Sequence, residues 1–139
     1  MALQVKAKKP ATVLVVDDVW ISADLALIVL EQNGFKVKVV YSGSEALRWL
    51  ESNKPAVVLC DLAMPDMDGH AVAKAVHQRF GDSRPRMVAY TAYREEEERV
   101  ALMSAGFDDL ISKPAPVDVL AATIKHWAWL APADQPLLH

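Results

Sequence analysis

The stretch VVLCDLAMPDMDGH, residues 57–70, changes from apolar to polar within a few positions. Its first part, Val57 to Cys60, is apolar at every position, which is typical of a parallel strand covered on both faces. Asp61 follows directly, and Pro65 and Gly69 beyond it are typical of a loop. Because an isolated buried charge is costly, a carboxylate at the end of such a strand needs an explanation in the fold.

Apolar runs of strand length recur along the chain and alternate with segments of helical length. We expect strands at residues 12–16, 36–41, 56–62, 87–91 and 110–112. We expect helices at residues 21–32, 42–52, 70–80, 94–104 and 117–130. This alternation predicts right-handed crossovers, and hence an α/β domain with a doubly wound, five-stranded parallel sheet and five helices.

Several of the expected helix ends carry local signals. Ser42 and Glu45 have the spacing of a capping box at the start of one helix. Pro116 stands where the last helix begins, and Gly34 and Gly106 stand where two helices end. These residues support the alternation because each marks a boundary between an expected helix and a loop.

The composition is that of a folded chain without an evident nucleic-acid or membrane partner. Hydrophobic residues make up 53% of the 139 residues, which excludes a disordered chain and fits one domain. The formal net charge of −3 gives no reason to expect nucleic acid, and no apolar run has the length of a membrane span. Met1 to Pro10 lacks the pattern of a signal sequence, and Cys60 alone forms no internal disulfide. We therefore expect a cytoplasmic domain at residues 11–131, between a flexible tail at 1–10 and a tail at 132–139.

Polar residues stand at the carboxyl ends of the expected strands: Asp17 and Asp18, Asp61, Thr91, and Lys113. The carboxyl ends of parallel strands share one edge of the sheet, where open α/β folds place their functional crevice. If the strands ending at Asp17 and Asp61 are neighbours, three carboxylates lie close together and repel one another unless a cation is bound. Oxygen ligands without clustered histidine or cysteine favour Mg²⁺.

A carboxylate in this position can act as a nucleophile and form an aspartyl phosphate. Phosphoryl transfer needs positioning and neutralisation by a metal ion, a lysine and a hydroxyl group. The acidic pair with Mg²⁺, Lys113 and Thr91 would supply these groups, so we expect Asp61 to receive a phosphoryl group. Trp20, two residues after Asp18, is expected near the mouth of this site, where Mg²⁺ would alter its fluorescence.

Four segments together resemble the receiver domain of two-component response regulators. They are LVVDDV, CDLAMPDMDG, YTAY and SKPA, which occur in this order, each at the end of an expected strand. The resemblance covers residues 11–130, nearly the whole chain. It implies a phosphorelay protein with the flavodoxin-like receiver fold, in which the strands stand in the order 2-1-3-4-5.

The resemblance also implies how the site works. Asp61 would accept the phosphoryl group from a histidine kinase or a phosphotransfer protein. Asp18, Asp61 and the backbone carbonyl of Ala63 would bind Mg²⁺ directly, and Asp17 would help through water. Lys113 would pair with the phosphate.

The switch, by the same resemblance, is Thr91, which would move toward the phosphate and change the binding of a downstream protein. Leu110 departs from the family, because the position three residues before the motif lysine usually carries an aromatic residue that couples the threonine to the output face. Ala63 and Tyr93 occupy the two positions that tune the phosphate lifetime in the family. The chemistry is expected to survive these departures, whereas the route of switching stays open.

The last expected helix carries an apolar stripe, Leu120, Ile124 and Trp127, that is suited to packing on the sheet. At roughly 100° per residue, Trp129 points away from this stripe. We interpret Trp129 as part of a surface for a partner protein or for a homodimer, with packing against the end of the chain as the alternative.

Two other functions compete with a phosphorylation-controlled switch that is not an enzyme. A phosphatase of the haloacid-dehalogenase type also uses a strand-end aspartate and Mg²⁺, but it normally needs a second acid where this chain has Ala63. A pseudo-receiver would act through protein contacts without phosphorylation. The intact acidic residues, Thr91 and Lys113 argue against it, whereas Leu110 keeps it open.

Overall fold

A computed structural model describes residues 10–92 and 96–130 of the chain, and it describes residues 96–98 without their side chains. Some of the expectations lie outside these described residues. They concern the two terminal tails, Tyr93, and the start of the helix expected at residues 94–104.

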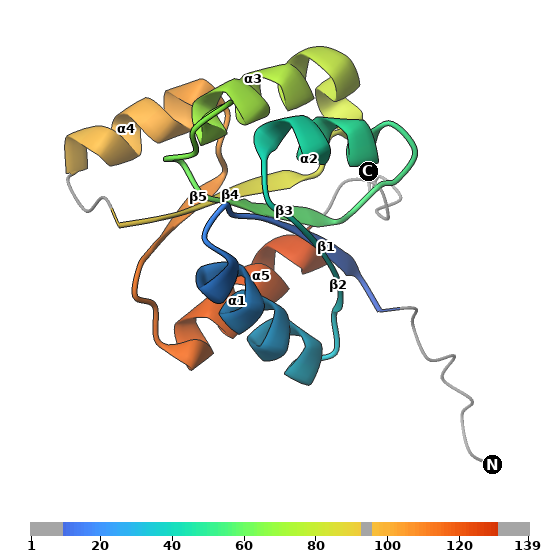
Figure 1. Ribbon diagram of the computed structural model, residues 1–139, viewed down its shortest axis with the longest axis vertical. Coiled ribbons are helices and arrows are strands. Elements are labelled where there is room, and N and C mark those ends of the chain that lie inside the picture. The colour runs from blue at the N-terminus through green and yellow to red at the C-terminus, as the bar shows by residue number, and fades with distance from the viewer. Residues whose placement is uncertain (1–9, 93–95, 131–139) are drawn as a thin grey trace.

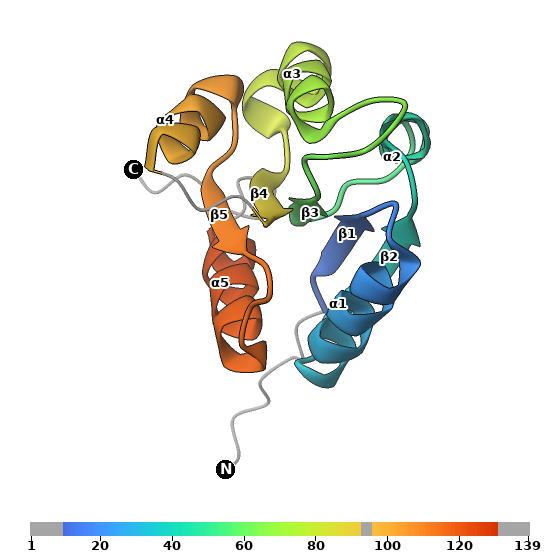
Figure 2. The ribbon, with the colours of Figure 1, turned by 60° about the vertical axis from the view of Figure 1, so that its left-hand side comes forward.

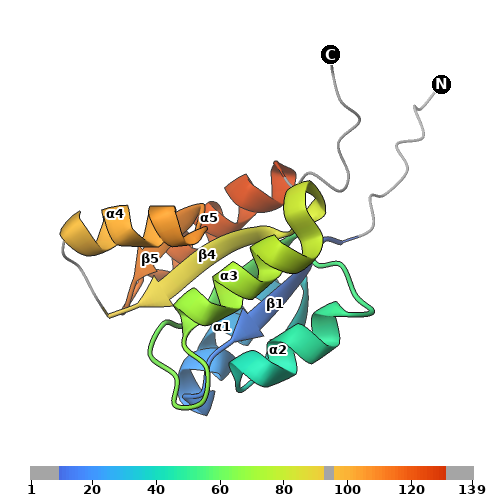
Figure 3. The same cartoon turned by 90° about the horizontal axis from the view of Figure 1, so that it is seen from above.

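The centre of the molecule is a parallel sheet with the strand order β2-β1-β3-β4-β5, as predicted. The strands are β1 (Thr12–Val16), β2 (Lys36–Val40), β3 (Val57–Cys60), β4 (Arg86–Thr91) and β5 (Asp109–Ser112). Figure 3 shows β1 and β4 pointing the same way across the sheet. The register pairs Val16 of β1 with Cys60 of β3 and Thr91 of β4 with Ser112 of β5. The strands therefore end together at one edge of the sheet.

Helices cover both faces of this sheet. They are α1 (Trp20–Gln32), α2 (Gly43–Leu50), α3 (Gly69–Phe80), α4 (Glu96–Ala105) and α5 (Val117–Trp129). In Figure 1, α1 and α5 lie on one side of the sheet and α2, α3 and α4 lie on the other. A short 3₁₀ helix, Gly81–Ser83, follows α3 and was not predicted. Within residues 10–92 and 96–130, no helix is both long and apolar enough to cross a membrane.

The apolar core has two parts, one on each face of the sheet. Leu14 and Val58 belong to the part beneath α2, α3 and α4, whereas Val15 and Val57 belong to the part beneath α1 and α5. Successive side chains of a strand point to opposite faces, so an interior strand contributes to both parts. This explains why β3 is apolar at every position, and Asp61 is the first polar residue after it.

The ends of the elements differ from the prediction by one or two residues at several places. β3 ends at Cys60 and not at Leu62, because the Leu62 amide donates to the Asp61 Oδ1 atom at 2.9 Å instead of continuing the ladder. The Ser42 hydroxyl caps α2 by accepting from the Glu45 amide at 3.1 Å. The expected capping box is only half formed, since the Glu45 carboxylate accepts from the Tyr41 amide at 3.3 Å.

Figure 2 shows the connections that leave the ends of the strands and enter the helices. The Asp68 carboxylate caps α3 by accepting from the Ala71 amide at 2.9 Å. Gly106 follows α4 with a φ of +111°, a left-handed conformation that favours glycine, as its predicted place after a helix requires.

Candidate functional site

The residues just beyond three strands are fixed by backbone hydrogen bonds that extend the sheet. The amide of Asp17 donates to the Val40 carbonyl at 3.2 Å, and the amide of Asp61 donates to the Val16 carbonyl at 2.9 Å. The amide of Lys113 donates to the Thr91 carbonyl at 2.8 Å. Each functional side chain is therefore held in the register of the sheet, although none of the three residues belongs to a strand.

Three carboxylates meet at this edge. One oxygen from each of Asp17, Asp18 and Asp61 can be chosen so that the three atoms lie within 4.8 Å of one another. Asp17 is almost fully buried, at 1% exposure, and Asp61 is 7% exposed. The register of β1 with β3 explains the meeting of Asp17 and Asp61, because each follows one residue of the Val16–Cys60 pair.

A single ammonium group bridges two of these acids. The Lys113 Nζ atom donates to Asp17 Oδ2 at 2.9 Å and lies 3.7 Å from Asp61 Oδ1. The Lys113 side chain is 20% exposed. The peptide bond between Lys113 and Pro114 is cis. This lysine offsets part of the repulsion within the cluster, and more negative charge remains than it can neutralise.

The remaining hydrogen bonds of the carboxylates leave an oxygen of Asp18 without a partner among the described residues. Asp17 Oδ1 accepts from the Val19 amide at 3.0 Å, and Asp61 Oδ1 accepts from the Leu62 amide at 2.9 Å. Asp18 Oδ1 is buried without a hydrogen-bond partner among the described residues. An orphaned carboxylate oxygen among other carboxylates fits a hard divalent cation, which takes oxygen ligands. The donor set therefore fits Mg²⁺.

The surroundings of Asp61 act on its acidity in opposite directions. Burial raises the pKa of the Asp61 carboxyl group, the Lys113 ammonium lowers it, and the charge of Asp17 raises it. Burial and the neighbouring Asp61 also raise the pKa of the Cys60 thiol. Cys60 is fully buried, with its Sγ atom donating to the Asp61 carbonyl at 3.3 Å, so it is an unreactive core thiol.

Gly69 is where the chain passes closest to the acceptor position. Its amide donates to the Leu62 carbonyl at 2.9 Å. A Cβ atom at Gly69 would lie 2.5 Å from the backbone oxygen of Asp61 and 2.9 Å from Leu62 Cδ2. Only glycine allows this approach without a shift of the backbone that carries Asp61.

Thr91 and Ala63 take different positions at this edge. Thr91 is the last residue of β4 and is 2% exposed, whereas Ala63 lies in the loop after Asp61 and is exposed. Leu110 is partly buried and packs against the core beneath α2, α3 and α4. An aliphatic side chain therefore occupies the place of the aromatic residue that the resemblance leads one to expect.

Tyr90 belongs to the site and was missed by the sequence analysis. The Lys113 Nζ atom lies 4.7 Å from the centroid of its ring, a cation–π geometry. Burial raises the pKa of the Tyr90 hydroxyl group, although Lys113 opposes the shift, so the ring stays neutral. The register explains the contact: Tyr90 pairs with Ile111, and Lys113 follows on the same side two residues later.

Both tryptophans singled out in the sequence are exposed. Trp20 opens α1 and is 63% exposed, and Trp129 ends α5 and is 70% exposed. Trp127 instead packs against the core, and its Nε1 atom donates to Asp109 Oδ2 at 2.8 Å. The predicted division of α5 into a packed stripe and an outward-facing Trp129 is therefore confirmed.

Curated relatives match most of this chain. An "Uncharacterized 14.6 kDa protein in sodA1 3'region" of Leptolyngbya boryana is 36% identical over 123 residues, which cover 88% of this chain and 93% of that protein. The sensor histidine kinase GacS of Pseudomonas protegens is 35% identical over 127 residues, which cover 88% of this chain and 14% of the kinase. The matched region is thus almost all of one relative and a small part of the other.

A solved structure shares the fold. The response regulator receiver domain protein (CheY-like) of Methanospirillum hungatei is 25% identical, with a TM-score of 0.81, over 91% of this chain and 99% of that one. The family model of the response regulator receiver domain matches residues 13–125. This range contains all three clustered acids and all five strands, apart from Thr12, the first residue of β1. On this match and the identity to its relatives, the chain belongs to the response regulator receiver domain family, a family of two-component signalling.

Proposed function

We propose that this chain is a phosphorylation-controlled switch in which Asp61 accepts a phosphoryl group and Mg²⁺ assists. The observation that carries the proposal is the Lys113 ammonium group 3.7 Å from Asp61 Oδ1, within a cluster of three carboxylates. This arrangement supplies a nucleophile, a fixed cation and oxygen ligands for a second cation at one place. The domain would act as a switch that binds proteins and not as an enzyme that turns over a small substrate.

The acceptor in this proposal is a carboxylate oxygen of Asp61. The phosphoryl group would pass from a phosphohistidine nitrogen of the donor to this oxygen, so that a P–N bond breaks, a P–O bond forms and the imidazole nitrogen takes up a proton. Burial raises the pKa of Asp61, and Lys113 opposes this effect and so favours the ionised carboxylate. It would then share its charge with the phosphate, because its Nζ atom already lies beside the acceptor.

The metal site in this proposal consists of Asp18, Asp61 and the backbone carbonyl of Ala63, with Asp17 acting through water. Bound Mg²⁺ would supply positive charge that offsets the charge of the phosphate oxygens. The buried Oδ1 atom of Asp18, which has no partner in the described part of the chain, supports a direct role for this residue. Asp17 already accepts from Lys113 and from the Val19 amide, which supports a more remote role.

Thr91 is the proposed switch, because it is buried at the end of β4 next to β5, the strand that Lys113 directly follows. Its movement toward the phosphate would change the surface beside β4 and β5 and so alter the binding of a downstream protein. Leu110 cannot carry this signal through an aromatic rotamer. A route through Leu110 would depend on its packing against the core beneath α4.

The proposed phosphodonor is a histidine kinase or a phosphotransfer protein, and the kinase that contains a matching region supports this choice. A donor has to approach the edge where Asp61 lies. α1 begins two residues after Asp18 and exposes Trp20, Ile21 and Leu25, each more than half exposed. We place this encounter in the cytoplasm, and the apolar surface of α1 would contribute to it.

The test is phosphorylation by acetyl phosphate in the presence of Mg²⁺, followed by the intact mass of the protein. The proposal expects a mass gain of one phosphoryl group that needs Mg²⁺ and is lost in Asp61→Asn. A gain that persists in Asp61→Asn would remove Asp61 from its role, and no gain at all would favour a pseudo-receiver. Steady turnover of p-nitrophenyl phosphate would favour a phosphatase.

A further inference from the structure

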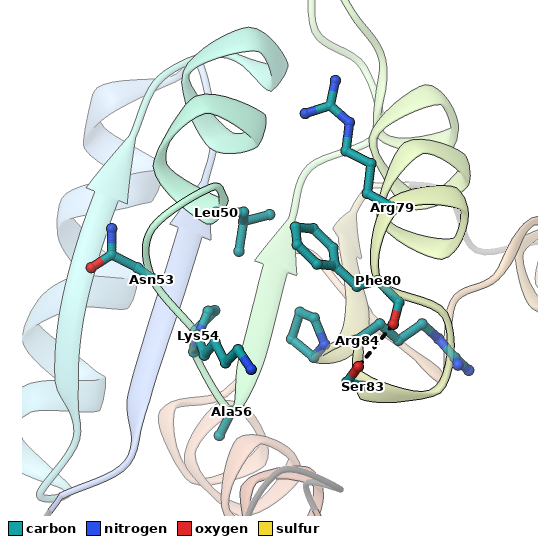
Figure 4. A pocket seen from close by; sticks show the side chains of 10 residues that line it. Leu50, Asn53, Lys54, Ala56, Arg79, Phe80, Ser83 and Arg84 are labelled. Carbon is teal, nitrogen blue, oxygen red and sulfur yellow. Dashed lines mark hydrogen bonds between the residues drawn. The ribbon is translucent and has the colours of Figure 1, made fainter.

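A pocket lies at the edge of the sheet opposite to the acidic cluster. It opens between the loop after α2, residues 51–56, and the end of α3 with the 3₁₀ helix that follows it (Figure 4). Its volume is about 120 Å³. Ala56, which lines it, precedes β3, whereas Asp61 follows β3, so the pocket and the acceptor stand at opposite ends of one strand. At ~3.3 Å per residue, this separation is about 16 Å.

Five of the ten residues that line this pocket are apolar. Leu50 and the ring of Phe80 face each other across it in Figure 4. Ala56, Pro55 and Pro85 complete the apolar lining, and all three are buried in their own right. An apolar concavity with a few polar groups is the usual form of a small-molecule site. An engineered apolar cavity of about 150 Å³ holds benzene, so a volume of this order accepts a single ring.

The charged groups around the pocket are all cationic. The lining residues include Lys54, Arg79 and Arg84 and no aspartate or glutamate. Lys54 extends from the loop after α2 into the space between that loop and α3 (Figure 4). Among residues 10–92 and 96–130, no carboxylate lies within 4.0 Å of Lys54 Nζ or of the Arg84 guanidinium group.

The two arginines have weak or incomplete pairing. Arg79 Nη1 lies 3.9 Å from Glu51 Oε1, and both side chains are well exposed. Arg84 Nη1 donates to the Gly81 carbonyl at 3.3 Å, while its Nε atom is buried without a partner in the described part of the chain. The Ser83 hydroxyl donates its only proton to the Phe80 carbonyl at 3.0 Å and so has none left for an anion. The cations Lys54, Arg79 and Arg84 are what favours an anion at the rim.

We propose that this pocket binds a small aromatic carboxylate of about the size of benzoate. The ring would lie between Leu50 and Phe80, and the carboxylate would pair with Lys54 at the mouth. Neither the acidic cluster nor Lys113 contributes to this site. The inference is independent of phosphorylation, since it uses residues at the other end of β3 and α3.

The test is a titration of the full chain, labelled with ¹⁵N, with benzoate and separately with benzyl alcohol, which has the ring without the charge. Saturable shifts of amide signals confined to the lining residues are expected with benzoate. Lys54→Met keeps the aliphatic stem and removes the charge. This variant should lower the affinity for benzoate about fivefold, which is the upper end for the loss of an exposed ion pair. Its affinity for benzyl alcohol should stay unchanged. Lys125→Met, on the exposed face of α5, is the matched control and should bind benzoate like the original chain.

Two further variants separate the pocket from its alternatives. Phe80→Ala should lower the affinities for benzoate and for benzyl alcohol alike, by about tenfold, because both ligands lose the same apolar wall. Asp61→Asn should bind benzoate unchanged, whatever the outcome of the phosphorylation experiment. Shifts spread over the surface, no saturation, or equal benzoate affinity in Lys54→Met and Lys125→Met would overturn the proposal.

Discussion

Lys113 Nζ and Asp17 Oδ2 lie 2.9 Å apart, a direct contact between residues 96 positions apart in the sequence. The contact exists because β1 and β5 end at the same edge of the sheet, although two other strands separate them. Asp17 is 1% exposed, so the Lys113 ammonium group takes the place of water around this carboxylate far more than at a surface aspartate.

Replacing Lys113 by alanine should destabilise the fold because it leaves Asp17 buried without its cation. A lost hydrogen bond to a charged group costs about 2 kcal/mol, and we expect a fall of this order in the free energy of unfolding. Urea denaturation in EDTA measures it, with the exposed Lys125→Ala as the control. Equal stability of the two variants would show that the Lys113–Asp17 contact does not hold the edge together.

The Asp61 carboxylate should lower the stability of the folded state at neutral pH. Burial raises the pKa of Asp61 above the ordinary aspartate value of 3.8, so the folded state binds its proton more tightly than the unfolded state does. Asp61 therefore lowers the stability of the folded state most at pH values above its raised pKa. This stability is regained as the pH falls toward 3.8 and the carboxyl group takes up its proton. Without metal, Asp61→Asn should therefore melt at a higher temperature than the original chain at pH 7.5.

The difference in melting temperature between these two proteins should shrink as the pH is lowered. Thermal denaturation in EDTA at a series of pH values measures it. Asp118→Asn, which removes an exposed carboxylate from α5, is the control. A difference that stays constant from pH 7.5 to pH 4 would mean that burial does not dominate at Asp61.

Binding of Mg²⁺ should be visible at Trp20. This side chain opens α1 two residues after Asp18, and we expect its fluorescence to change as the repulsion among the carboxylates is relieved. At a hundred times its dissociation constant, Mg²⁺ should add about 2.7 kcal/mol of stability. Trp20→Phe identifies the signal, Asp18→Asn should abolish the response, and NaCl of equal ionic strength controls for screening. If Mg²⁺ stabilises the protein fully against heat but leaves the fluorescence unchanged, then Mg²⁺ binds and Trp20 does not sense it.

The pattern of apolar runs was sufficient to predict a parallel sheet and the place of the acids, whereas the strand order came from the family resemblance. Asp17, Asp61 and Lys113 each follow an apolar run directly, and the carboxyl ends of parallel strands must share an edge. Tyr90 could not be found this way, because its contact with Lys113 depends on the register of β4 with β5. The pocket beside Phe80 was also out of reach, since the ends of α2 and α3 form it and only their packing brings them together.

A side chain at position 69 should shift the backbone that carries Asp61. A Cβ atom there would press on the backbone oxygen of Asp61, so Gly69→Ala should cost about 2 kcal/mol of stability and slow phosphorylation by acetyl phosphate. Gly34→Ala is the matched control: its φ of +89° strains an alanine, but its Cβ meets no atom within 4 Å. It should lower stability by about 1 kcal/mol and leave phosphorylation unchanged.

Trp129 should contribute to self-association of the chain. It is 70% exposed at the end of α5, and a large aromatic side chain at the centre of an interface is worth about 2 kcal/mol or more. If the chain forms a homodimer through this face, Trp129→Ala should weaken it by about thirtyfold. Sedimentation equilibrium over a range of concentrations measures the dimer constant before and after phosphorylation. Trp20→Ala removes a tryptophan of similar exposure from α1 and should leave the dimer intact. Equal effects of the two variants would contradict an interface at α5.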